Sequence, residues 1–156
     1  MSLFEVFDWL EQLPIGVAIR DSLWLFPVVE AGHLLGFVML GGAVFVLDLR
    51  LLGFGLRERS IAYVERQTRP WLIAAVGVLF ATGIPLFLSE AIKCYYSTAF
   101  WVKMGALGMA LPFTFVFRNR LAQQESLRPA NARWLGTASI AVWLTVAAAG
   151  RWIGFS

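Results

Sequence analysis

The chain alternates between long apolar segments and shorter polar segments. The longest apolar run, Leu23 to Leu47, has 25 residues, and only Glu30 and His33 in it can ionise. A helix of that length reaches about 37 Å at ~1.5 Å per residue, which is enough to cross a hydrocarbon layer of ~30 Å. The same pattern predicts membrane-spanning helices over residues 23–52, 70–90, 98–117 and 134–153. We therefore expect an all-α polytopic membrane protein, with residues 1–156 forming one antiparallel four-transmembrane-helix bundle.

An amphipathic helix is predicted before the first span, over residues 2–12. Ser2 and Glu5 have the spacing of a capping box, and the apolar residues that follow fall on one side of the helix. Such an interfacial helix can lie flat at a membrane surface, or it can pack on the bundle or on a partner subunit. Pro14 is expected to start a turn that runs to Asp21.

Prolines and small residues add detail to the spans. Ser60 is expected to cap a short surface helix that turns Ile61 and Val64 inward, and Pro70 suits the first position of the second span. Kinks are expected at Gly83 and Pro85 and at Pro112. Small residues predict close helix contacts, since short side chains let backbones approach in lipid. They are Gly32 and Gly36, Gly77 and Ala81, and the face formed by Trp101, Gly105, Gly108 and Pro112.

Composition and charge placement support this class. The sequence is 59% apolar and 15% charged, with a mean hydropathy of +0.71, whereas a soluble domain is ~45–50% apolar and ~25% charged. Nine of the thirteen Lys and Arg residues fall in the connections after the first and third spans: Arg50, Arg57, Arg59, Arg66, Arg69, Arg118, Arg120, Arg128 and Arg133. The positive-inside rule places these connections in the cytoplasm. We therefore expect a bacterial inner-membrane protein with both termini outside, and no removed signal peptide.

Ionisable side chains gather in the outer half of the predicted bundle. They are Glu30, His33, Glu90, Lys93, Cys94 and Lys103. In the inner half we expect only Asp48, near the edge and paired with Arg50. An ionisable group at the membrane centre costs ~2.5–3.5 kcal/mol on insertion scales, so it is rarely present without a function or a partner.

His33, the single histidine, is the leading candidate for a functional residue. A neutral imidazole can ligate haem iron, hydrogen-bond a quinone, transfer protons, or be satisfied structurally within the bundle. A bis-histidine haem needs two ligands, so a haem b here would need five-coordinate iron, a methionine such as Met109, or His33 of a symmetric partner. Glu30 could orient the imidazole. Lys103 could neutralise an anionic cofactor group, pair with Glu30, or extend to the headgroups.

The single cysteine, Cys94, excludes an internal disulfide framework. It is interpreted as an inert loop thiol, with copper binding as the alternative if soft ligands such as Met104 lie nearby.

Two segments, HLLGFVMLGGAVFVLDLRLLG and AFWVKMGALGMALPFTFVFRNR, carry a resemblance to known proteins. They resemble a group of uncharacterised small four-helix bacterial inner-membrane proteins, itself loosely similar to the copper-resistance D family and to membrane b-type cytochromes. The resemblance covers roughly residues 23–150. It implies that His33 and Lys103 are the functional positions.

The leading hypothesis is a redox-linked membrane protein that binds b-type haem or a quinone through His33. We expect an electron-transfer or accessory protein more than a stand-alone enzyme, and assign no catalytic residue. One alternative is a non-catalytic anchoring or assembly subunit that docks through its acidic N-terminal helix. Another is a small metal or solute transporter. The expected partners are the lipid bilayer and either further copies of the chain or other membrane subunits, with no nucleic acid.

Overall fold

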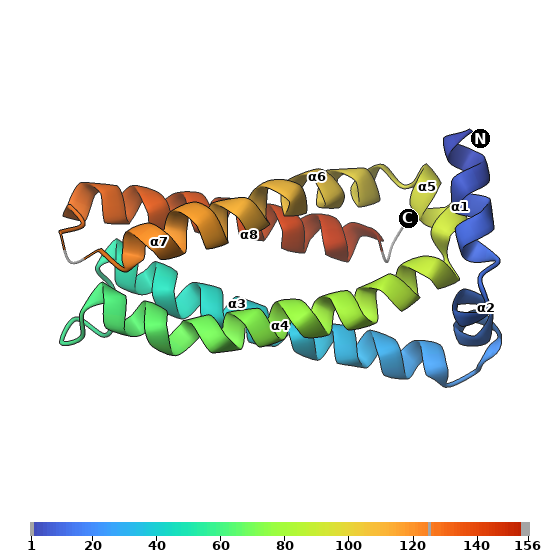
Figure 1. Cartoon of the computed structure of the whole chain (residues 1–156), viewed down its shortest axis with the longest axis horizontal. Coiled ribbons are helices and arrows are strands. Elements are labelled where there is room, and N and C mark those ends of the chain that lie inside the picture. Colours follow the sequence, from blue (N-terminus) through green and yellow to red (C-terminus); the bar gives the residue numbers. More distant parts are fainter. Residues whose placement is uncertain (1, 125, 154–156) are drawn as a thin grey trace.

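The computed structural model describes residues 2–124 and 126–153, and this part of the chain contains helices and no strand. Its elements are α1 (Leu3–Glu11), α2 (Pro14–Asp21), α3 (Leu25–Leu52), α4 (Ile61–Ser89), α5 (Ala91–Tyr96), α6 (Thr98–Pro112), a π-helical segment (Phe113–Arg118), α7 (Asn119–Ala122) and α8 (Pro129–Ile153). Figure 1 shows the long helices running side by side along the length of the molecule.

Four helical stretches are long and apolar enough to cross a membrane, which confirms the predicted class. They are α3, α4, the continuous stretch Thr98–Ala122 that joins α6 to α7, and α8. Trp24, Trp71, Trp101, Trp134 and Trp152 are all exposed, as expected for tryptophans at membrane interfaces.

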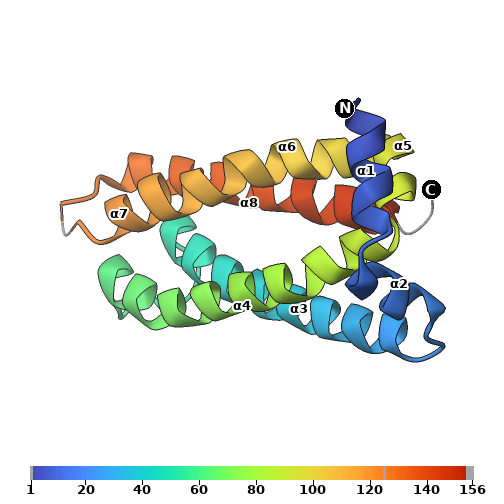
Figure 2. The same cartoon turned by 45° about the vertical axis from the view of Figure 1, so that its right-hand side comes forward.

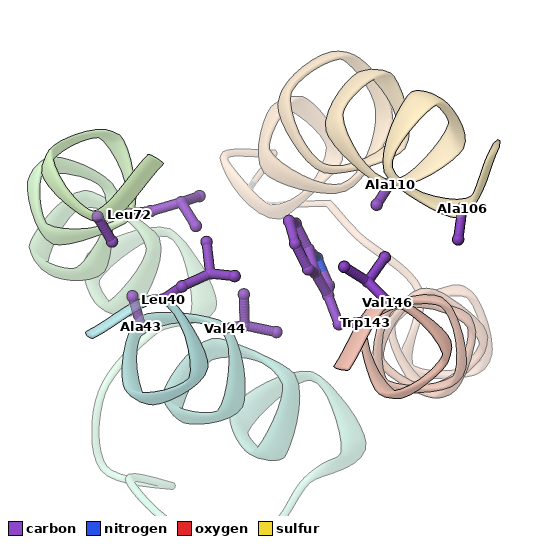
Figure 3. Packing of buried hydrophobic residues seen from close by; sticks show 9 residues of the cluster. Leu40, Ala43, Val44, Leu72, Ala106, Ala110, Trp143 and Val146 are labelled. Carbon is purple, nitrogen blue, oxygen red and sulfur yellow. The ribbon is translucent and has the colours of Figure 1, made fainter. Parts of the chain in front are cut away.

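The bundle consists of two helix pairs, α3 with α4 and α6 with α8, joined where α3 packs on α8. Side chains from all four helices form the central core: Leu40, Ala43, Val44, Leu72, Ala75, Ala106, Ala110, Trp143 and Val146. Figure 3 shows the Trp143 indole in the middle of the bundle, between the helix pairs. Its Nε1–H donates to Thr114 Oγ1 at 3.0 Å, so the largest core side chain has its polar atom satisfied.

The short helices α1, α2 and α5 lie at one end of the bundle, which we call the capped end (Figures 1 and 2). The opposite end, the loop end, carries the connections 53–60 and 123–128. Phe7 of α1 is buried at the capped end and makes ring contacts with Phe87, Tyr95, Phe100 and Trp101.

Helix α1 is fixed to the bundle by polar contacts as well. The carboxylate of Glu11 accepts the backbone N–H of Ile92 and pairs with Arg20 at 3.2 Å. The predicted Ser2–Glu5 capping box is present. The helix therefore packs on its own bundle, and part of its acidic face is already used there.

Several predicted boundaries are wrong. The second span begins at Ile61 and not at residue 70, because Ser60 caps a helix that continues through Pro70. Val64 is buried in the same hydrophobic cluster as Leu47 at the loop end, and this burial offsets the hydrogen bond that a proline inside a helix cannot make.

The remaining corrections concern the connections. Segments predicted as a turn from Pro14 to Asp21 and as a loop over 91–97 contain α2 and α5. The third span continues past residue 117 to Ala122, and the fourth begins at Pro129. The connections after the first and third spans are therefore shorter than the sequence pattern suggests.

The small residues divide into two groups. A Cβ added to Gly36 would lie 2.9 Å from Val78 Cγ1, and one added to Gly32 would lie 3.5 Å from Thr82 Cγ2, so this pair does bring α3 against α4. A Cβ at Gly77, Gly105 or Gly108 meets nothing within 4 Å, so these positions make no close helix contact within the described chain.

We expect Gly36→Leu to force α3 and α4 apart and to lower the free energy of unfolding by about 1–3 kcal/mol, the usual cost of overpacking. Unfolding by SDS in a mild detergent, followed by circular dichroism, measures the change. Gly77→Leu is the matched control because its side chain enters open space. Equal losses in both variants would contradict the proposed packing.

Candidate functional site

His33 lies on α3 where that helix meets α4. Its Nδ1 is 2.9 Å from Thr82 Oγ1. A Cβ added to Gly83 would lie 3.0 Å from His33 Cε1, so the absence of a side chain there gives the imidazole its space. Neighbouring residues of α4 thus provide a hydrogen-bond partner and room for the ring.

The hydrogen bonds of Thr82 determine which ring nitrogen carries the proton. Thr82 Oγ1 lies 2.7 Å from the carbonyl oxygen of Val78, which can only accept, so the single hydroxyl proton is donated there. The Nδ1 of His33 must then donate its own N–H to Thr82 Oγ1. In the neutral ring Nε2 is therefore unprotonated, with a lone pair available to a ligand or a proton.

Lys103 of α6 reaches the same half of the bundle. It is half-buried, and a Cβ added to Gly150 of α8 would lie 3.8 Å from its Nζ. Its charge lies within electrostatic range of His33 and of Cys94. Across residues 2–124 and 126–153 its ammonium group has no hydrogen bond or ion pair, so the expected pairing with Glu30 does not occur.

Glu30 and Met109 are not part of this arrangement. Glu30 is exposed on α3 and forms no hydrogen bond or ion pair with the residues that the structure describes. It therefore does not orient the His33 imidazole. Met109 is 65% exposed on α6 and lies on the surface of the bundle.

The remaining residues of the predicted cluster lie at the capped end. Glu90 pairs with Lys93 at 3.8 Å, and both side chains are exposed. Cys94 is buried beside Phe7, Ala91 and Phe100. Burial, helped by the charge of Glu90, raises the pKa of the Cys94 thiol to about 11, although Lys103 and Lys93 oppose the shift. Such a thiol remains protonated near neutral pH and is a poor metal ligand.

A second polar site, which sequence reasoning missed, lies at the loop end. Arg118 is 1% exposed, and its Nη1 donates to Asp48 Oδ1 at 2.9 Å and to Ser139 Oγ at 3.0 Å. Its Nε donates to Asn119 Oδ1 at 3.2 Å. The expected pairing of Asp48 with Arg50 is therefore wrong, and Arg50 donates to the carbonyl of Arg59 at 2.8 Å.

The π-helical segment after Pro112 brings Arg118 inward. In sequence Arg118 stands beside Arg120 and looks like part of a basic connection, yet the helix continues and its widened turns place Arg118 inside the bundle. Removing one partner of such a buried pair costs ~3–5 kcal/mol. The only signal in the sequence was the proline ahead of an apolar stretch that ends in arginine.

The structure contains two shallow apolar pockets outside these polar sites. One of 250 Å³ lies between α3 and α4 and is lined by Met39, Gly42, Ala43, Val46, Thr68 and Trp71. One of 50 Å³ between α3 and α8 includes Gly41 and Trp143. His33 and Lys103 line neither. Among the described residues no group of three His, Cys, Asp or Glu side chains could hold a metal ion.

Four apolar spanning helices define a multi-pass membrane protein, with one half-buried polar site near the capped end and a buried ion pair near the loop end. The chain belongs to a family of unknown function, DUF6644, whose model matches residues 7–156. No curated protein and no solved structure matches the chain significantly. The family agrees with the expected resemblance to an uncharacterised family, and no similarity to copper-resistance D proteins or to cytochromes was found.

We expect Thr82→Val to remove the acceptor that keeps the proton on Nδ1 of His33, so that the Nε2–H tautomer becomes populated. Because the chain has a single histidine, ¹⁵N spectra of histidine-labelled protein report this ring alone. Thr145→Val is the control, since the Thr145 hydroxyl donates to the carbonyl of Ala141 on α8. A wild-type ring protonated at Nε2 would contradict the assignment.

Proposed function

We propose that this protein binds an isoprenoid quinone in the capped half of the bundle, as a redox-linked component of a bacterial inner membrane. The observation that carries the proposal is the presence, in one half of the bundle and within electrostatic range of each other, of an ammonium on Lys103 without a partner among the described residues and an unprotonated ring nitrogen on His33. A half-buried cation without a counter-ion is costly, which favours a ligand that supplies an acceptor.

The two groups are complementary to the two forms of a quinone. Lys103 has donors only and can hydrogen-bond a carbonyl oxygen of the oxidised form. Nε2 of His33 is an acceptor and can take the hydrogen bond of a hydroxyl group in the reduced form.

The surroundings also suit a flat ring that arrives from the bilayer. Lys103 follows Phe100 by one helical turn, and the Phe100 ring stacks on Phe87 with centroids 5.5 Å apart. Helices α4 and α6 belong to different pairs and make no extended contact.

A six-coordinate b-type haem does not fit the described residues of a single chain. Nε2 of His33 could ligate iron, but Met109 is exposed on α6 and provides no second axial ligand beside it. Six-coordinate haem would therefore require a ligand from outside the chain, such as His33 of a second copy, whereas five-coordinate iron would need His33 alone.

The charge distribution supports an orientation. The connections at the loop end carry Arg57, Arg59 and Arg128, so we place that end in the cytoplasm and the capped end on the outer side.

We expect a short-chain ubiquinone or menaquinone to quench tryptophan fluorescence of the purified protein saturably, since Trp101 lies at the capped end. Lys103→Met should weaken binding about tenfold or more, because a hydrogen bond to a charged group contributes ~1.5–3 kcal/mol. Lys93→Met is the matched control, as its ammonium pairs with Glu90 at the surface.

Two outcomes would overturn the quinone proposal. One is quenching that rises linearly with quinone, or that is equal in wild type and Lys103→Met, which reports partitioning into detergent. The other is a Soret band in the purified protein that disappears in His33→Ala, which would replace quinone by haem.

A second candidate function, a subunit that assembles with other membrane chains, is favoured by Glu30. This carboxylate is exposed on α3. It lies five residues after the first residue of that helix, which is roughly 8 Å along the helix axis at ~1.5 Å per residue. A carboxylate exposed to lipid at that depth is expensive, so a partner helix that donates a hydrogen bond would stabilise it.

We expect native mass spectrometry in mild detergent to find an oligomer of this chain, and Glu30→Gln to increase the monomer fraction severalfold. Glu90→Gln serves as the control because Glu90 has its partner, Lys93, within the chain. A monomeric wild type, or oligomers unaffected by Glu30→Gln, would contradict this candidate.

A further inference from the structure

The buried polar cluster at the loop end has an unbalanced charge. Asp48 is 0% exposed, Glu65 is 2% exposed and Arg118 is 1% exposed, and they come from α3, α4 and the π-helical segment. Both carboxylates lie within electrostatic range of the one guanidinium. Two negative charges and one positive charge leave one negative charge in excess inside the bundle.

The other groups that face the cluster are neutral. They are Asn119 of α7, Gln123 directly after α7, and Ser139 of α8. In the described part of the chain no second Lys or Arg forms an ion pair with either carboxylate. The excess charge therefore has no compensation from the protein.

Two carboxylate oxygens in the cluster are unsatisfied. Asp48 Oδ1 accepts from Arg118 at 2.9 Å and Glu65 Oε2 accepts from Gln123 Nε2 at 3.2 Å. Asp48 Oδ2 and Glu65 Oε1 are buried without a hydrogen-bond partner among the residues described. Buried polar atoms are usually satisfied, so two orphan acceptors in one cluster indicate a missing positive ligand.

We propose that the Asp48–Glu65–Arg118 cluster is a proton-binding site, which holds one proton on either of its two carboxyl groups. A bound proton neutralises the excess negative charge and is bonded to one of the carboxylate oxygens that lack a hydrogen-bond partner. Both carboxylates lie within electrostatic range of the same guanidinium, so a proton on either one balances the charge of the cluster. This site is separate from the His33–Lys103 site, and the proposal stands without a quinone.

The position of the cluster gives it access to solvent. Gln123 is exposed, and its amide is hydrogen-bonded to the buried carboxylate of Glu65. Rotation of this one side chain would connect Glu65 to the water at the loop end. The exchange of the proton is therefore expected with the side of the membrane that faces the loop end.

Infrared difference spectroscopy on the full-length protein in liposomes tests the proposal. We expect a carbonyl stretch of a protonated carboxyl group at neutral pH, shifted in D₂O and lost at alkaline pH. Glu65→Gln and Asp48→Asn should each abolish the band, because removing either carboxylate already balances Arg118. Arg118→Met should retain it, if that variant folds.

The controls distinguish this cluster from other carboxylates and other cations. Glu30→Gln and Glu90→Gln should leave the band unchanged, since both residues lie outside the cluster. The titration of the wild type is repeated in sodium and in potassium chloride. The proposal would be overturned if the band is absent in wild type at neutral pH, or if it survives in Glu65→Gln. Selective loss of the band in sodium chloride would also overturn it, in favour of a sodium site.

Discussion

The ion pair between Arg118 and Asp48 constrains the loop end of this bundle more than any other single interaction. It joins the third span to the first, and the same guanidinium reaches Ser139 on the fourth. In lipid there is little hydrophobic incentive for helices to associate, so close packing and polar links must hold them. A buried charge without a partner is very costly. The pair therefore fixes the register of these helices, because sliding any one of them by a turn would leave the charge of Arg118 unpaired.

The π-helical segment and the buried pair depend on one another. Widened turns after Pro112 direct Arg118 inward, and the energy of the buried pair in turn stabilises a backbone form that is rare in helices. Trp143 bonds to Thr114 within the same segment, so the irregular turns are packed against the central core. The irregular turns thus contribute directly to the packing of the third span against the other helices.

The two ends of the molecule use ionisable groups differently. At the loop end the charges are fully buried and connected to one another. Toward the capped end, His33 and Lys103 are half-buried. Each has an unused hydrogen-bonding group, which is an acceptor on His33 and a set of donors on Lys103. The unused capacity at the loop end consists of carboxylate acceptors alone, which suits a proton, whereas the capped half offers both a donor and an acceptor, which suits a quinone. This difference is why the quinone site is placed at the capped end.

The four spans can be predicted from hydrophobicity alone, because an apolar run long enough to cross the bilayer is typical of a membrane-spanning helix. The sequence also predicts the Ser2 and Ser60 caps and the close approach at Gly36, since these depend on local spacing. The charged and polar partners, in contrast, are known only from the three-dimensional packing of the helices. Asp48 and Arg118 are 70 positions apart, and Thr82 is 49 from His33. Such partners depend on how each helix is rotated about its axis and on which helices are neighbours in the bundle. Hydrophobic periodicity does not predict either property here, because the spans are apolar on every side.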